Sequence, residues 1–181
     1  MNTLKYEKQY FCDKCKYAKN GIKVVTGRNN PFYAEGADRK AIKSYWKKRL
    51  DTITAKYNTE QSTEVFFKDV QSLMKTMNSE FPNGFARGKF HYIDALRSIS
   101  VILKYRWCKE DQYPNYPMPP RCPISKPILR TIGSNYSEYV DNQIKKKDVL
   151  SIYSEFQIEA NKQDPKDISI WELRTYNKIT R

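Results

Sequence analysis

The chain has 181 residues, and its 33 Lys and Arg exceed its 20 Asp and Glu by 13 positive charges. This length fits one domain, and contents of 39% apolar and 14% aromatic residues exclude a mostly disordered chain. Because a basic protein attracts polyanions, nucleic acid is the expected partner. The alternative is that the lysines only keep the surface solvated.

Neither a membrane span nor a secretory signal is predicted. The longest apolar run, residues 99–103, is interrupted by Ser100, and the N-terminus MNTLKYEKQYF has no hydrophobic core region. We therefore expect a soluble, cytoplasmic protein without a membrane partner. In that reducing compartment the four cysteines are free thiols or metal ligands rather than disulfides.

Residues 1–35 differ from the rest of the chain. Cys12 and Cys15 form a Cys-x-x-Cys pair, Asn20-Gly21 is a turn signal, and residues 22–26 are a short β-branched run. This pattern predicts a small cysteine-bearing hairpin or ribbon, followed over residues 36–181 by a helical domain. The predicted fold class is mainly α, with a single helical domain.

After this segment, the periodicity of apolar residues predicts three successive helices. Asp38 can cap a helix that runs to about residue 57, and Thr63 starts a second helix that ends at residues 82–84. A third helix, about residues 91–107, is apolar nearly all round, so it should be the central, buried helix. His91, the only histidine, is expected to cap that helix or to pack.

Prolines indicate where helices begin and end in the C-terminal part of the chain. Six of them in residues 112–127 exclude helix there and predict an extended, semi-rigid crossover. The helical signal returns weakly at Ile128 and clearly over residues 149–160, with Asp148 as its candidate cap. Pro165 is expected to open the last helix.

The cysteines predict one structural zinc ion and no other cofactor. A Cys-x-x-Cys turn directs two thiolates at one ion, and zinc takes four ligands in a tetrahedron. The candidate ligands are Cys12, Cys15, Cys108 and Cys122. The alternative is that they are unmetallated thiols, Cys108 being a small buried apolar residue. No βαβ pattern surrounds the Cys-x-x-Cys pair, which disfavours a redox role.

The middle of the chain contains two distinctive segments. They are residues 85–108, FARGKFHYIDALRSISVILKYRWC, and residues 119–129, PPRCPISKPIL. They resemble a family of small prokaryotic and phage proteins that read roughly F-R-I-x-x-A-Q-K-x-x-S-V-x-L-K-H-x-W-C and then P-P-x-C-P-x-D-R-I-I. The Trp-Cys and Pro-Pro-x-Cys-Pro elements are its most specific parts. The resemblance implies a prokaryotic or phage source and brings no established activity.

The same segment is similar to helix-hairpin-helix DNA glycosylases. In those enzymes a lysine that opens a buried helix attacks the sugar C1′, and an aspartate stabilises the developing positive charge. The matching positions here hold Arg97 and Ser125. Because arginine stays protonated and serine has no carboxylate, the resemblance implies a scaffold that grips DNA without this catalysis. Lys89 or Lys104 as a replacement nucleophile is the enzymatic alternative.

Basic side chains suited to nucleic acid gather at several places. The candidates are the helix stripe Lys40, Lys43 and Lys47, then Arg87, Lys89 and Arg97 at the central helix, Arg106 and Arg121 near its far end, and the run Lys145, Lys146 and Lys147. A glycine and a helix start next to Arg87 would let a phosphate approach the backbone N–H groups. The alternative is structural, with Arg97 paired to Asp94 and Arg106 to Glu110.

We therefore predict a nucleic-acid-binding protein without catalysis, its ligand being double-stranded DNA. The alternative from another class is a protein-interaction module that inhibits or redirects a host complex through an acidic partner. A nuclease is a third alternative, because acidic pairs exist at Glu64 with Asp69 and at Glu155 with Glu159. On helices such pairs are usually solvated partners of lysines. No phosphate-binding loop or serine-hydrolase motif is present.

Overall fold

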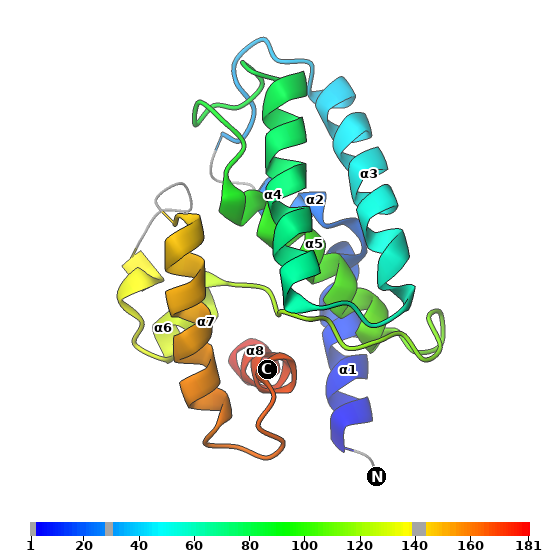
Figure 1. Ribbon diagram of the computed structural model, residues 1–181. Coiled ribbons are helices and arrows are strands. Elements are labelled where there is room, and N and C mark those ends of the chain that lie inside the picture. The colour runs from blue at the N-terminus through cyan, green and yellow to red at the C-terminus, as the bar shows by residue number, and fades with distance from the viewer. Residues whose placement is uncertain (1–2, 28–30, 139–143) are drawn as a thin grey trace.

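The computed structural model describes residues 3–27, 31–138 and 144–181 (Figure 1). These ranges contain α1 (Thr3–Lys14), α2 (Ile22–Val25), α3 (Arg39–Ala55), α4 (Thr63–Glu80), α5 (Tyr92–Cys108), α6 (Lys126–Thr131), α7 (Lys146–Ala160) and α8 (Ile168–Thr180), with 3-10 turns η1 (Lys16–Asn20), η2 (Lys56–Asn58) and η3 (Asn135–Glu138). The predicted mainly helical class is confirmed. None of the described helices is long and apolar enough to cross a membrane.

Helix α5 runs through the centre of the protein, as predicted. All of its residues except Arg106 are buried. It packs against α1, α2, α3, α4, α7 and η1. A helix that is apolar on every side is stable in water only when other elements surround it, so the remaining helices form a shell around α5.

Helices α3 and α4 lie side by side at the top of Figure 1 and begin at capping residues. The Asp38 carboxylate accepts hydrogen bonds from the backbone N–H groups of residues 40 and 41, and the Ser62 hydroxyl accepts one from Val65. Such caps satisfy N–H groups that have no partner within the helix. In the core, the ring of Trp46 from α3 meets that of Phe90 edge to face, with centroids 4.8 Å apart.

The N-terminal hairpin is not found, because residues 22–25 form helix α2 instead of a strand. Gly21 explains the difference. A Cβ atom at this position would collide with the Ser98 carbonyl oxygen of α5. The glycine therefore allows a close approach to α5 rather than a hairpin turn. Helix α1 packs against α5 and α8.

Three predicted helix starts in the C-terminal part are wrong. Helix α6 begins at Lys126, before the predicted return of helix at Ile128, and Pro127 lies in its first turn, where a proline is tolerated. The other two are the starts of α7 and α8. Helix α7 begins at Lys146, and Asp148 lies in its first turn, where its carboxylate accepts a hydrogen bond of 2.8 Å from the Lys145 N–H. Helix α8 begins at Ile168, after Pro165. Asp167 is its cap and accepts hydrogen bonds from the N–H groups of residues 169 and 170. In both cases an aspartate carboxylate near the start decides where the helix begins.

Removing the Phe90 side chain should test the packing of the core. Phe90 is 0% exposed, so we expect Phe90→Ala to lower the free energy of unfolding by about 3–5 kcal/mol through lost burial and a residual cavity. Ile158 of α7 is 59% exposed, and Ile158→Ala should change stability by less than about 0.5 kcal/mol. Urea denaturation measures both variants. Equal effects would contradict this placement of Phe90.

Candidate functional site

The predicted lysine stripe lies on the outer face of α3. Lys40, Lys43 and Lys47 are all exposed. Lys47 Nζ donates to Asp51 Oδ2 over 3.0 Å, and Lys43 Nζ lies 5.6 Å from the centre of the Tyr33 ring. Because an exposed ion pair between residues i and i+4 is weak, the stripe presents its positive charge to the solvent.

Arg87 holds the start of α5 instead of facing the solvent. Its Nη2 donates to both carboxylate oxygens of Asp94, over 2.9 and 3.0 Å, and its guanidinium lies 5.4 Å from the centre of the Phe32 ring. Asp94 also accepts from the His91 N–H over 2.9 Å. The Arg87 guanidinium therefore holds the start of α5 in place, whereas the side chain of the nearby Lys89 is exposed to solvent.

The other three predicted arginines donate to carbonyl groups of the fold. Arg97 Nε donates to the Ile124 oxygen over 2.8 Å, and Arg106 Nη1 to the Thr54 oxygen over 3.1 Å. Arg121 Nη1 donates to the Pro120 oxygen over 3.2 Å. The bonds of Arg97 and Arg106 tie α5 to the proline-rich crossover and to the end of α3, whereas the bond of Arg121 lies within the crossover. The predicted pairing of Arg106 with Glu110 is wrong, because Glu110 accepts from Lys8 over 2.7 Å.

A groove between α4 and α7 gathers further lysines. Lys146 Nζ donates to Gln71 Oε1 over 3.0 Å, which places the start of α7 beside α4. Lys68 lines the groove with Lys146, and Lys75 lies further along the same side of α4. We define the basic groove as Lys68, Lys75, Lys145, Lys146 and Lys147, all of which are exposed.

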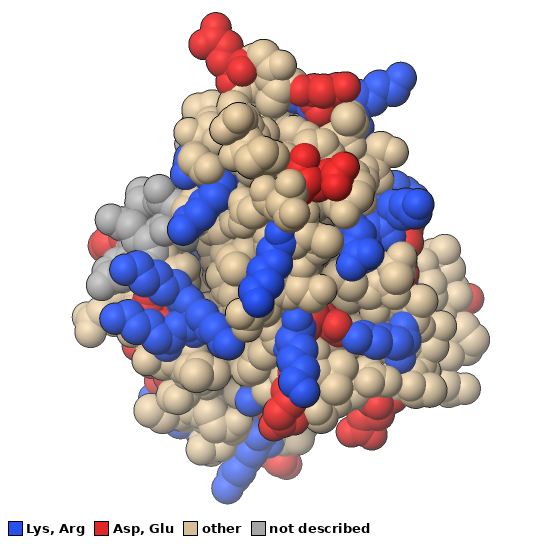
Figure 2. All heavy atoms as spheres, turned by 45° about the horizontal axis from the view of Figure 1, so that its top comes forward, with Lys and Arg blue, Asp and Glu red and all other residues tan. Residues whose placement is uncertain are grey.

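The basic groove keeps its positive charge unpaired. Within residues 3–27, 31–138 and 144–181, none of its five lysines forms an ion pair. The acidic group that lines it is Glu64, at the first turn of α4. Figure 2 shows Lys and Arg side chains spread over one face of the molecule, with acidic groups both among them and toward its edges.

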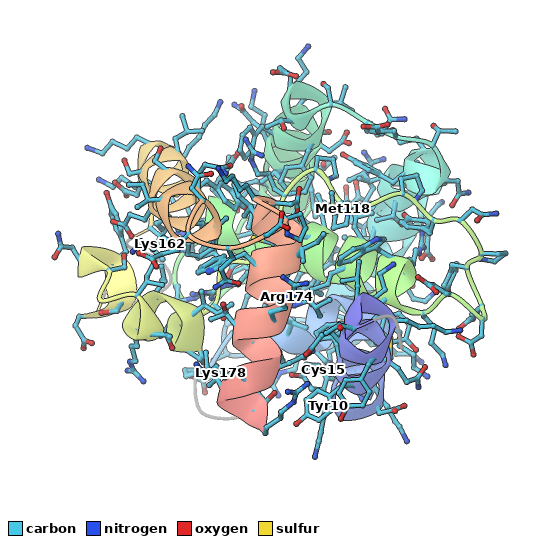
Figure 3. All side chains as sticks on the ribbon, turned by 90° about the horizontal axis from the view of Figure 1, so that it is seen from below. Tyr10, Cys15, Met118, Lys162, Arg174 and Lys178 are labelled. Atoms are coloured by element: carbon cyan, nitrogen blue, oxygen red, sulfur yellow. The ribbon has the colours of Figure 1, made fainter. Side chains whose placement is uncertain are left out.

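The four cysteines do not come together. Cys12, Cys15 and Cys108 belong to the small core between α1, α5 and α8, whereas Cys122 lies in the main core. Cys12 and Cys108 share a hydrogen bond that lowers the pKa of Cys12, while burial raises the pKa of Cys108. Cys15 Sγ instead lies 3.3 Å from the Tyr176 hydroxyl. Figure 3 shows Cys15 and Tyr10 beside the C-terminal half of α8.

These positions do not fit a four-cysteine zinc site. Among the described residues, no three His, Cys, Asp or Glu side chains form a group that could hold a metal ion. The predicted nuclease carboxylates are likewise dispersed. Asp69 accepts hydrogen bonds from Lys56 and Tyr57, and Glu159 pairs with Lys162. No step that needs a metal is therefore assigned to these residues.

A pocket lies between α1, η1, α5, α8 and residues 123–127. It brings together Arg97 and Ser125, the two positions that the glycosylase resemblance singled out, and Lys104. Neither Arg97 nor Ser125 can supply the neutral amine or the carboxylate of that reaction. The pocket is instead built around a buried pair of opposite charges, formed by Lys104 and Glu172.

No family model, curated protein or solved structure matches the chain. The geometry alone therefore carries the functional argument. Sequence analysis missed Lys68, Lys75 and Glu172. The first two are seven residues apart, which places them on one face of a helix, and this spacing could have revealed them. Glu172 lies between two apolar residues of α8, a position where a charge requires a buried partner.

Burial of His91 should lower its pKa below 6.5, the ordinary value for histidine, because the charged imidazole loses its hydration. Asp94 opposes this shift and Arg87 adds to it. Since the folded state then binds fewer protons than the unfolded state, stability decreases as the pH falls from 6.5 toward the pKa of the folded protein.

The only histidine in the chain gives one imidazole C2 proton signal, so an NMR titration measures this pKa directly. The urea-unfolded protein is the control and should titrate near 6.5. A pKa at or above that value in the folded protein would contradict the buried position of His91.

Proposed function

We propose that the protein binds double-stranded DNA through the basic groove, without catalysis. The observation that carries this proposal is the pairing of α4 with the start of α7. The Lys146–Gln71 hydrogen bond places Lys146, the first residue of α7, beside Lys68 of α4, and Lys145 and Lys147 flank Lys146 in the chain. Lysines that neutralise phosphates release the counterions around DNA, and this release supplies most of the affinity of sequence-independent binding.

The chemistry of the groove favours a duplex over a single strand. Proteins that bind single strands stack the bases on exposed aromatic side chains. Among the described residues, the exposed aromatic side chains are Tyr6 and Tyr17, which belong to the N-terminal segment rather than to α4 or α7. The two aromatic residues that line the groove, Phe67 and Tyr92, are half-buried and buried. Lysines without an exposed aromatic platform suit the phosphates of a duplex, whose bases are already stacked.

The lysine stripe on α3, formed by Lys40, Lys43 and Lys47, also favours DNA as the partner. Its lysines add positive charge next to α4, because α3 and α4 pack together. Lys47 shares its charge with Asp51, so this stripe should contribute less than the groove. An acidic protein would be attracted by the same charges, and it is the partner to pursue if DNA does not bind.

Charge reversal should separate these surfaces. The triple variant Lys68→Glu, Lys75→Glu, Lys146→Glu should weaken binding to a short fluorescent duplex about 100-fold, because it replaces three phosphate contacts with repulsion. The corresponding changes at Lys40, Lys43 and Lys47 should weaken it about tenfold. Fluorescence anisotropy measures both, and circular dichroism confirms that each variant is folded.

A third triple variant controls for net charge. Lys5, Lys16 and Lys23 are exposed residues of the N-terminal segment, so changing them to Glu alters the total charge by the same amount. We expect this variant to lose less than about threefold in affinity, an effect of overall charge alone. Equal losses in all three variants would contradict a localised site. Wild-type protein that does not bind duplex DNA would overturn the proposal.

A further inference from the structure

The pocket between α1, η1, α5 and α8 is large enough for a small molecule. Its volume is about 310 Å³, and much of its wall is apolar, including Phe11, Val24, Val101 and Ile124. No role in binding DNA has been assigned to it. A pocket with apolar walls and a few polar groups in fixed positions is the usual form of a small-molecule site.

A buried ion pair forms the polar part of the wall. Lys104 Nζ donates to Glu172 Oε2 over 2.5 Å, and the two side chains are 2% and 1% exposed. The ammonium also lies 4.3 Å from the centre of the Phe11 ring and 4.9 Å from that of Tyr176. Two aromatic faces thus stabilise its charge where water is excluded.

The Lys104–Glu172 pair has hydrogen-bond donors and an acceptor oxygen that none of the described residues bonds to. An ammonium group has three N–H donors, and within the described part of the chain only one of those on Lys104 has an acceptor. The second carboxylate oxygen of Glu172, Oε1, accepts no hydrogen bond from the described part of the chain. Burial raises the pKa of the Glu172 carboxyl, and Lys104 opposes this effect.

Ser125 adds a third polar group to the residues that line the pocket. Its hydroxyl is buried and has no hydrogen-bond partner among the described residues. A buried hydroxyl without a partner destabilises a protein by about 1–3 kcal/mol, so a ligand that bonds to it removes this penalty. Arg97 also lines the pocket, but its Nε is already bonded to the Ile124 carbonyl.

We propose that this pocket binds a small, uncharged, planar molecule that presents a hydrogen-bond acceptor beside a donor, as a carboxamide or lactam does. The acceptor would face the Lys104 ammonium, the donor would face Glu172 Oε1, and the planar body would lie among the apolar side chains. Because the two charges of the pair already compensate each other, a charged ligand would leave one of them unbalanced.

Three probes of equal shape test the charge of the ligand. Benzamide is neutral and carries the donor and acceptor, benzoate is an anion, and benzamidine is a planar cation. Ligand-detected NMR and isothermal titration give their affinities for the wild-type protein. We expect benzamide to bind at least about tenfold more tightly than either charged probe, the effect of roughly one hydrogen bond to a charged group. Tighter binding of benzoate, or no binding of benzamide, would overturn the proposal.

A double variant tests the ion pair. Lys104→Met with Glu172→Leu removes both polar partners and keeps the volume, and such replacements of buried ion pairs often leave the fold intact. We expect it to lose benzamide binding by at least about tenfold. Lys178→Met, at an exposed position of α8 that does not line the pocket, removes one positive charge and should bind benzamide as the wild type does. Unchanged affinity in the double variant would overturn the proposal, and circular dichroism shows whether it has folded.

Discussion

The structure depends on the burial of α5 on all of its sides. Every residue of this helix except Arg106 is buried, including Asp94, Arg97 and Lys104. A charged group in such a place must find a partner inside the protein. Arg87 pairs with Asp94, the Ile124 carbonyl accepts from Arg97, and Glu172 pairs with Lys104. These bonds fix the residues before α5, the crossover after it and α8 around one central axis.

The positively charged side chains of this arrangement fall into two groups, those that hold the fold together and those that lie on its surface. The arginines of the central region are used as structural donors, and their guanidinium groups face carbonyls or carboxylates of the fold. The lysines of α3, α4 and the start of α7 lie on the outside, where Lys146 meets the side of α4. At the basic groove a polyanion therefore encounters lysines, which act as point charges on phosphates, rather than the forked guanidinium donors that recognise base edges. Sequence-independent binding agrees with this distribution.

Local signals predicted the middle of the chain well and its ends poorly. The predicted cap Asp38, the predicted helix start at Thr63 and the apolar periodicity of residues 91–107 define α3, α4 and α5 because the evidence for each helix is local in the sequence. The hairpin at residues 22–26 was wrong because Gly21 serves a contact with α5, which is distant in the sequence. The same limit applies to the site. The exposed stripe on α3 followed from helical spacing, but the meeting of Lys146 with α4 and of Lys104 with Glu172 depends on tertiary packing.

The salt dependence of duplex binding tests the central claim most directly. Each phosphate that a protein neutralises contributes a slope of about −0.9 to the plot of log affinity against log salt concentration. If all five lysines of the basic groove contact phosphates, the wild-type slope is about −4.5, and the variant with Lys68, Lys75 and Lys146 changed to Glu has a slope of about −1.8. A slope near zero, or the same slope in both proteins, would contradict the assignment of the basic groove as the DNA-binding surface.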